Sequence, residues 1–258
     1  MNDCSIRDLD LAGVQWELSD VPMVTRAKWN ANAAATNAVP MNNTQTPGNA
    51  PRVMVVPPIA PIESVGVDTA ISMAARPTDI DNLIRMIGEF NHPLRSAATQ
   101  TVFPNIAKNP NGLVIVTDVP GSDDDASGQI LSGRAGELLD KMLNAIDMSR
   151  DTVSIVPIIF WRTPGGRTPT ADELALSRPF VNRLLEFLSP KMILTLGATP
   201  ASEIANIALT HAHGKISNTQ SGTPVMSIYH PNYLLLKPSA KRDVWTALQE
   251  LQNLLKNQ

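Results

Sequence analysis

An aspartate followed by a tight turn is the first candidate for chemistry, because it places an acid beside free backbone amides. Asp118 comes directly after the apolar run Gly112–Thr117 and just before Pro120 and Gly121. A Pro-Gly turn can direct backbone N–H groups toward a ligand while the acid stays close. The alternative is that Asp118 only forms the turn and that the acids at 123–125 are a solvated charge run.

A histidine at the end of another apolar run is the second candidate. His230 follows the run Pro224–Tyr229, and a histidine in that place could donate a hydrogen bond to a developing anion. The next residues, Leu234–Leu236, would form an exposed apolar tip, which is costly unless it packs or inserts somewhere. The alternative is a histidine with local partners. His211 and His213 have no carboxylate at a suitable spacing, so we expect them at the surface rather than on a metal.

Two arginines in a Gly- and Pro-rich loop are the third candidate. Arg162 and Arg167 both lie in the segment 161–170. A guanidinium group matches the geometry of phosphate oxygens, so this loop could contact a phosphate backbone. The alternative is an ordinary exposed loop with surface arginines.

These loops need a scaffold that brings distant segments together. The expected strands are 112–117, 153–160, 192–196 and 224–229, and the expected helices are 80–90, 133–146, 172–188 and 240–256. This alternation predicts an α/β protein, a three-layer α/β/α domain with a central four-stranded parallel sheet. Sites in such sheets form beyond the carboxyl ends of the strands, so Asp118 and His230 should face one crevice.

Composition excludes several classes of protein. With 43% hydrophobic but only 4% aromatic residues, the core should be aliphatic. The net charge of −3 excludes a strongly basic, histone-like binder, although a local basic groove is compatible with it. The single cysteine, Cys4, excludes an internal disulfide and any metal site built on several thiolates. The start of the chain is polar and no long apolar run occurs, so we expect a cytoplasmic protein without a membrane segment.

The N-terminal third has a different character. Residues 1–77 are rich in Pro, Ala and Asn and predict an irregular extension and linker, which leaves 78–258 as the domain. Within the extension, 52–59 is either a short edge or partner-binding strand or an extended coil. The extension could therefore bind a protein partner, and we expect the domain itself to be a monomer.

Taken in order, the motifs resemble the uracil-DNA glycosylase superfamily, most closely its family 4. The segment 117–121 is similar to that family's Gly-Glu-Ala-Pro-Gly motif, and 128–139 to its Gly-x-Pro-Phe-Val-Gly-x-Ala-Gly-x-Leu-Leu run. Three further segments match its Arg-Pro-Pro-x-Asn-Arg-x-Pro-Thr loop, its Pro-Lys strand ending in Leu-Gly, and its His-Pro-Ser/Ala-x-Leu-Leu motif: 162–170, 190–197 and 230–235. Each motif is weak alone, but the order and spacing across residues 80–255 are specific.

The resemblance implies hydrolysis of the N-glycosidic bond of a deoxyuridine flipped out of DNA, with uracil or a related base as product. It gives Asp118 the role of orienting water or stabilising the oxocarbenium-like state, and His230 that of stabilising the departing anion. Leu234 and Leu235 would fill the gap in the base stack. The base pocket would be lined by Thr117, Val119, Pro120, Gly121, Leu131 and Pro157. The DNA would also be held by Arg162, Arg167, Asn232, Lys237, Lys241 and Arg242.

The sequence departs from the family at several positions. Family members commonly carry a four-cysteine iron–sulfur cluster, but the matching positions hold His92, Trp161 and Ser177. We therefore expect no 4Fe-4S cluster and no other cofactor. The family's uracil-reading asparagine corresponds to Pro157, whose side chain has neither donor nor acceptor, and its base-stacking phenylalanine to Leu131.

Three interpretations are compatible with both the matching motifs and the departures from the family. The first is an active glycosylase with altered or relaxed base specificity. The second, of equal weight as regards activity, is a catalytically impaired DNA-binding or protein-interaction member of the glycosylase fold. The third is a general α/β nucleotide-phosphate binder, which ranks last because the chain has no Gly-x-Gly-x-x-Gly or Walker motif.

Overall fold

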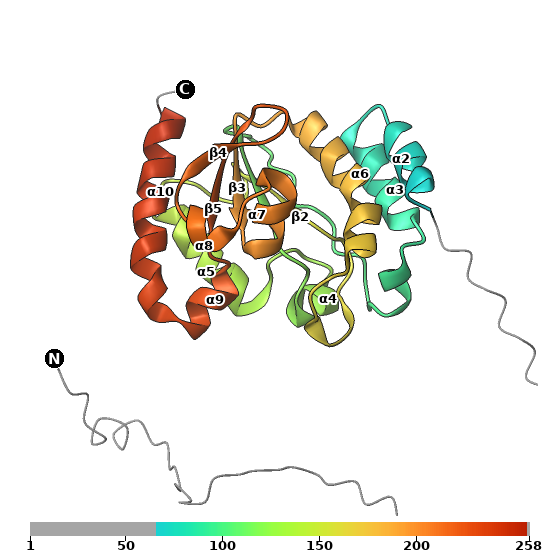
Figure 1. Ribbon diagram of the computed structural model, residues 1–258, viewed down its shortest axis with the longest axis horizontal. Coiled ribbons are helices and arrows are strands. Elements are labelled where there is room, and N and C mark those ends of the chain that lie inside the picture. The colour runs from blue at the N-terminus through green and yellow to red at the C-terminus, as the bar shows by residue number, and fades with distance from the viewer. Residues whose placement is uncertain (1–65, 257–258) are drawn as a thin grey trace, which may run out of the picture. The chain divides into compact units, whose positions relative to one another are not determined.

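The computed structural model of the protein describes residues 66–256. These residues belong to one unit, in which a sheet is covered by helices on both faces (Figure 1). The predicted strand within 52–59 and the predicted character of the extension up to residue 65 lie outside the described residues.

The sheet has the strand order β2-β1-β3-β5-β4. Its parallel strands are β1 (Leu113–Thr117), β2 (Ser154–Pro157), β3 (Met192–Leu196) and β5 (Pro224–Ile228), and β4 (Ile216–Asn218) runs antiparallel to β5. The predicted α/β domain with four parallel strands is thereby confirmed. The fifth strand, β4, was not predicted, because it is short and partly exposed and shows no apolar run.

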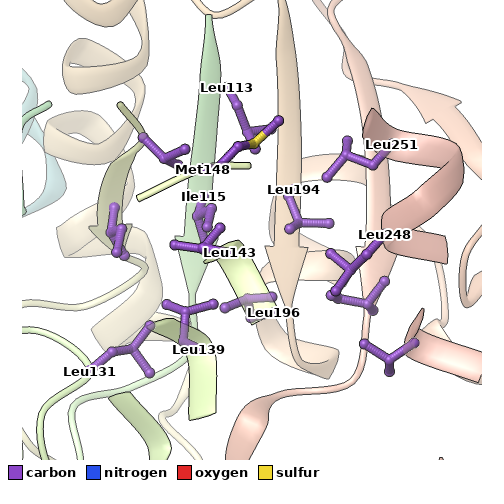
Figure 2. Packing of buried hydrophobic residues seen from close by; sticks show 14 of the residues in the cluster. Leu113, Ile115, Leu131, Leu139, Leu143, Met148, Leu194, Leu196, Leu248 and Leu251 are labelled. Carbon is purple, nitrogen blue, oxygen red and sulfur yellow. The ribbon is translucent and has the colours of Figure 1, made fainter. Parts of the chain in front are cut away.

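The parallel strands are apolar throughout because both faces of the sheet are buried. On β1, Leu113 and Ile115 belong to one core cluster, whereas Val114 and Val116 belong to the other. Successive side chains of a strand point to opposite faces, so a strand covered on both sides needs an unbroken apolar run. Figure 2 shows the first of these clusters, in which Leu residues of the strands meet those of the covering helices.

The helices divide between the two faces. The cluster of Figure 2 is completed by α5 (Gly133–Asn144), α9 (Pro231–Leu236) and α10 (Lys241–Lys256), and the opposite cluster by α2 (Val67–Ala75), α3 (Ile80–Glu89) and α6 (Ala171–Leu188). Shorter helices are α4 (Ser122–Ser127), α7 (Ala198–Ala205), α8 (Leu209–Ala212), η1 (Pro93–Ser96), η2 (Pro164–Gly166) and η3 (Pro238–Ala240). Across residues 66–256, no helix has both the length and the apolar character that crossing a bilayer would require.

Helix α2 corrects the predicted boundary of the domain. Residues 67–75 were expected to be linker, but they form a helix whose Ala70 and Ala74 are buried with α6 in the second cluster. The prediction of a linker that runs to residue 77 is therefore wrong for this segment. Its two small buried residues gave too weak an apolar pattern to predict a helix.

Candidate functional site

The carboxyl ends of β1, β3 and β5 meet at one edge of the sheet, because these strands are parallel neighbours. They carry Thr117 and Asp118, Gly197, and His230. Nε2 of His230 lies 3.1 Å from Oγ1 of Thr117, although the two residues are 113 positions apart in the chain. The structure therefore brings the first loop and the His230 loop to one place, as the topology predicted.

The ring of His230 is held at both nitrogens. Nδ1 accepts a hydrogen bond from the backbone N–H of Asn232 at 3.1 Å, so the proton of the neutral ring is on Nε2. That Nε2–H group donates to the hydroxyl oxygen of Thr117. Burial lowers the pKa of His230, and the charges of Asp118 and Asp124 oppose this effect without reversing it. Near neutral pH, His230 is thus an uncharged donor, and its N–H group points to Thr117 at the end of β1.

Asp118 is fixed between its own turn and the end of β3. Its Oδ1 accepts a hydrogen bond from the backbone N–H of Val119 at 2.9 Å. Its Oδ2 lies against Gly197, where an added Cβ would be only 2.9 Å away. Gly197 also has φ +107, which side-chain-bearing residues rarely adopt. A glycine at this position therefore allows the carboxylate to lie on the same strand ends as His230.

The acids that follow Asp118 are structural. Asp124 is 8% exposed and accepts hydrogen bonds from the backbone N–H groups of Gly121 and Ser132, at 2.9 and 2.7 Å. Asp125 is 5% exposed and accepts from the N–H groups of Thr99 and Gln100. The interpretation of 123–125 as a solvated charge run is therefore wrong for Asp124 and Asp125. These two carboxylates hold the turn after β1 in place.

Apart from Thr117, the expected base-pocket residues have no polar side-chain group, and they are buried or half-buried. Pro157 is buried at the end of β2 and lies in register with Thr117 of β1. Because β2 is the edge strand of the sheet, a proline in β2 interrupts no hydrogen-bond ladder with a further strand. Leu131 is 2% exposed and belongs to the core cluster of Figure 2. Of the other expected pocket residues, Pro120 is buried, and Val119 and Gly121 are half-buried.

The two arginines of the third loop differ in their partners. Arg167 makes a two-pronged ion pair with Glu173, with nitrogen–oxygen distances of 2.8 and 2.5 Å. This guanidinium is the largest cause that lowers the pKa of Glu173 to about 2. Arg167 is thus paired with the first turn of α6, which weakens its predicted contact with phosphate. No carboxylate among residues 66–256 pairs with Arg162, which is half-buried.

The apolar tip after His230 is not where the sequence placed it. Helix α9 directs Leu234 inward, where it is 1% exposed in the core cluster, and Leu235 is half-buried. The prediction of Leu234 as an exposed wedge is therefore wrong. Leu236 is the leucine that the helix presents to solvent, with 86% of its surface exposed. The other expected DNA contacts in this region are exposed: Asn232, Lys237, Lys241 and Arg242.

The residues at the positions that match cluster ligands do not fit an iron–sulfur cluster. His92 stacks on Trp161 at 4.7 Å between ring centroids; its Nδ1 accepts from Leu94 N–H and its Nε2–H donates to the Glu173 carbonyl. The indole N–H of Trp161 donates to Thr101, so neither ring offers a free lone pair. Ser177 has a buried hydroxyl without a protein partner, which is one weak ligand. Residues 66–256 contain no group of three potential metal ligands, and the absence of a cofactor stays a prediction.

A group of aromatic side chains beside His230 was missed by the sequence analysis. His213, expected at the surface, is half-buried and stacked on Tyr229, which in turn contacts Tyr233. A signal was present, because these are the chain's two tyrosines and they flank His230. The signal was too weak to use, since the third member comes from a different part of the chain.

Comparisons with known proteins agree with this geometry. A family model described as the uracil DNA glycosylase superfamily matches residues 103–252, more than half of the chain. The type-4 uracil-DNA glycosylase of Thermotoga maritima is 30% identical over 151 residues, which cover 57% of this chain and 79% of that protein. The type-4 enzyme of Archaeoglobus fulgidus is 28% identical over 160 residues, 58% of this chain and 80% of that protein. The chain therefore belongs to the uracil-DNA glycosylase superfamily.

Proposed function

We propose that the protein is a DNA repair glycosylase that hydrolyses the bond between deoxyribose and uracil, or a related base, after the nucleotide has flipped out of the helix. The observation that supports this best is the neutral His230, whose Nε2–H group lies 3.1 Å from Oγ1 of Thr117, the residue before Asp118, and whose ring is influenced by the charge of Asp118. A neutral donor and a carboxylate are the two groups that the reaction needs, one for each developing charge.

In this mechanism the base leaves as an anion while positive charge grows on the sugar. His230 donates its Nε2 proton in a hydrogen bond to an oxygen of the departing base, and the base must compete with Thr117 for that proton. Asp118 stabilises the oxocarbenium-like sugar or orients the water that attacks it. Water adds to the sugar carbon and loses a proton, the base anion gains one, and the products are the neutral free base and an abasic site. The fixed Nδ1 contact of His230 spares the ring any reorganisation during the reaction.

Contacts to DNA would come from the corner that follows His230. Lys237, Lys241 and Arg242 are exposed there and can pair with phosphates. Leu236, rather than Leu234, has the exposure needed to enter the space that a flipped nucleotide leaves behind.

The experiment that tests this function measures free base released by the full chain from uracil-containing single- and double-stranded oligonucleotides. Wild-type protein should release uracil, and His230→Ala should release it about 10²- to 10³-fold more slowly. Absence of release from uracil, hypoxanthine and other deaminated bases would contradict the proposal.

One alternative has support of its own, namely a DNA-binding member of the family with impaired catalysis. Leu131 is buried in the core, and Pro157 offers no polar group to a base. With Thr117 engaging the His230 proton as well, a bound base would find few hydrogen-bond partners. Salt-dependent binding to DNA without release of any base would favour this alternative.

An amide side chain at the end of β2 should increase the selectivity for uracil over cytosine. We expect Pro157→Asn to raise the ratio of uracil release to cytosine release by about tenfold or more, because buried polar groups that stay unpaired reject the wrong base. Pro157→Ala removes the same ring without adding an amide and is the matched control. Equal ratios for the two variants, measured with paired oligonucleotides, would show that residue 157 does not face the base.

Gly197 provides a test of the position of Asp118. Gly197→Ala should destabilise the protein by about 1–3 kcal/mol through its backbone conformation. It should also slow base release by about 10- to 100-fold, because the new Cβ displaces the Asp118 carboxylate. Gly222→Ala is the control, since Gly222 also has positive φ, +87, but no atom within 4 Å of an added Cβ. If both variants keep full activity while Gly197→Ala unfolds at a lower temperature, base release does not depend on the position of the Asp118 carboxylate beside Gly197.

A further inference from the structure

Three aromatic rings contact one another in a row, called the stack below, in which the first pair is stacked and the second pair is tilted. The ring centroids of His213 and Tyr229 are 4.2 Å apart with an angle of 30° between the planes. Those of Tyr229 and Tyr233 are 4.8 Å apart with an angle of 37°. The stack runs from a half-buried end at His213 to an exposed end at Tyr233, whose surface is 38% exposed.

The inner end of the stack is held by the sheet. His213 bridges to Ser227 of β5 through its backbone, and the N–H of Gly214 donates to the Ser227 carbonyl at 2.8 Å. Tyr229 follows β5 directly and is half-buried against the core cluster of Figure 2. Burial lowers the pKa of His213, so its ring is neutral near pH 7. The exposed Tyr233 therefore rests on rings whose positions are already fixed.

The surroundings of Tyr233 are positively charged. The ammonium group of Lys237 lies 6.0 Å from the centre of the Tyr233 ring. Helix α9, η3 and the start of α10 form one corner of the domain (Figure 1), and Lys241 and Arg242 are exposed on the same corner. Asp243 is the acid among residues 237–243. The corner thus combines a partly exposed tyrosine with three cations and one acid between residues 237 and 243, on a chain whose net charge is −3.

We propose that Tyr233, supported by Tyr229 and His213, is a stacking platform for an unpaired base of single-stranded DNA. Proteins that bind single strands combine aromatic faces, on which any base can stack, with cations that follow the backbone. A paired base would stay in its own stack, so the platform favours single-stranded DNA over duplex. The proposal rests on the proposed function, because that function makes DNA the partner. It adds a preference for single strands and names the residues that produce this preference.

The test measures binding of the full chain to a labelled single-stranded oligonucleotide that contains no uracil, by fluorescence anisotropy over a range of salt concentrations. Tyr233→Leu keeps an apolar side chain but loses the ring, and should weaken binding about 5- to 100-fold. Tyr233→Phe keeps the ring and should bind like wild type. Phe103→Leu is the matched control, because Phe103 is another aromatic residue with 38% exposure and should not affect binding.

Salt dependence separates stacking from charge. Lys237→Gln should lower the slope of log affinity against log salt by about 0.7, as expected for one lost phosphate contact to a single strand. Tyr233→Leu should leave that slope unchanged. With 2-aminopurine in the oligonucleotide, wild type and Tyr233→Phe should quench its fluorescence on binding, and Tyr233→Leu should not.

Two results would overturn the platform: wild-type affinity in Tyr233→Leu, or equal losses in Tyr233→Leu and Tyr233→Phe. Because the oligonucleotide lacks uracil, these outcomes do not depend on base release. A protein that releases uracil but binds single strands equally well with and without the Tyr233→Leu substitution contradicts the platform alone. A protein that stacks bases on Tyr233 but releases no base contradicts the proposed glycosylase alone.

Discussion

Replacement of His230 by alanine should lower the rate of uracil release by about 10²- to 10³-fold. This is the loss measured when one fixed donor to a developing oxyanion is removed from an enzyme. The donor in this protein is the Nε2–H group, which the Asn232 contact at Nδ1 holds in one tautomer. The loss should appear in single-turnover measurements of free base, because these report the bond-breaking step rather than release of the product.

The matched control for His230 is His211→Ala, which removes an exposed histidine and should leave the rate unchanged. The pH profile is a second check. Because burial lowers the pKa of His230 below its ordinary value of 6.5, the ring stays neutral above that pH and gains its second proton only below it. His230 should therefore cause no change in rate from about pH 6.5 upward. A His230→Ala protein with the wild-type rate would remove histidine from the mechanism.

The sequence was a good guide to the sheet because its strands are buried on both faces. Such strands are unbroken apolar runs, and β1, β3 and β5 were found on this basis. The same signal overextended β2, which was predicted over 153–160 but ends at Pro157. Ile158, Ile159 and Phe160 are as buried as the strand, although they lie outside it. An apolar run thus reports burial, and the backbone conformation depends on contacts made elsewhere.

The topology of the site was predictable, but its contacts were not. Parallel strand order alone brings the loops of Asp118 and His230 together. Three features of the site depend on contacts that the linear sequence does not display. They are the tautomer of His230, the burial of Asp124 and the contact of Gly197 with Asp118. Leu234 shows the limit most clearly, because a single turn of helix decides which leucine faces the core and which faces solvent.

Trp161→Ala should be among the most destabilising single substitutions in the domain. Trp161 is fully buried, stacked on His92 and in edge contact with Phe160 at 5.8 Å between centroids. Its loss leaves a large cavity and removes the hydrogen bond to Thr101. Substitutions of this kind cost about 3–5 kcal/mol, a large part of a typical total of about 5–15 kcal/mol. Thermal unfolding should therefore shift downward by roughly 10 °C.

The control for Trp161 is Trp245→Ala on α10, where the ring is 41% exposed and the change should cost less than about 1 kcal/mol. Comparing the two tryptophan variants also tests whether the residues at the positions that match iron–sulfur ligands act by packing or by binding a metal. If His92 and Trp161 stabilise the domain by packing, the purified wild-type protein should contain no iron. The loss of stability in Trp161→Ala should then be the same with or without a chelator. Stoichiometric iron in the wild type, or stability that falls on chelation, would show instead that a metal holds this part of the fold.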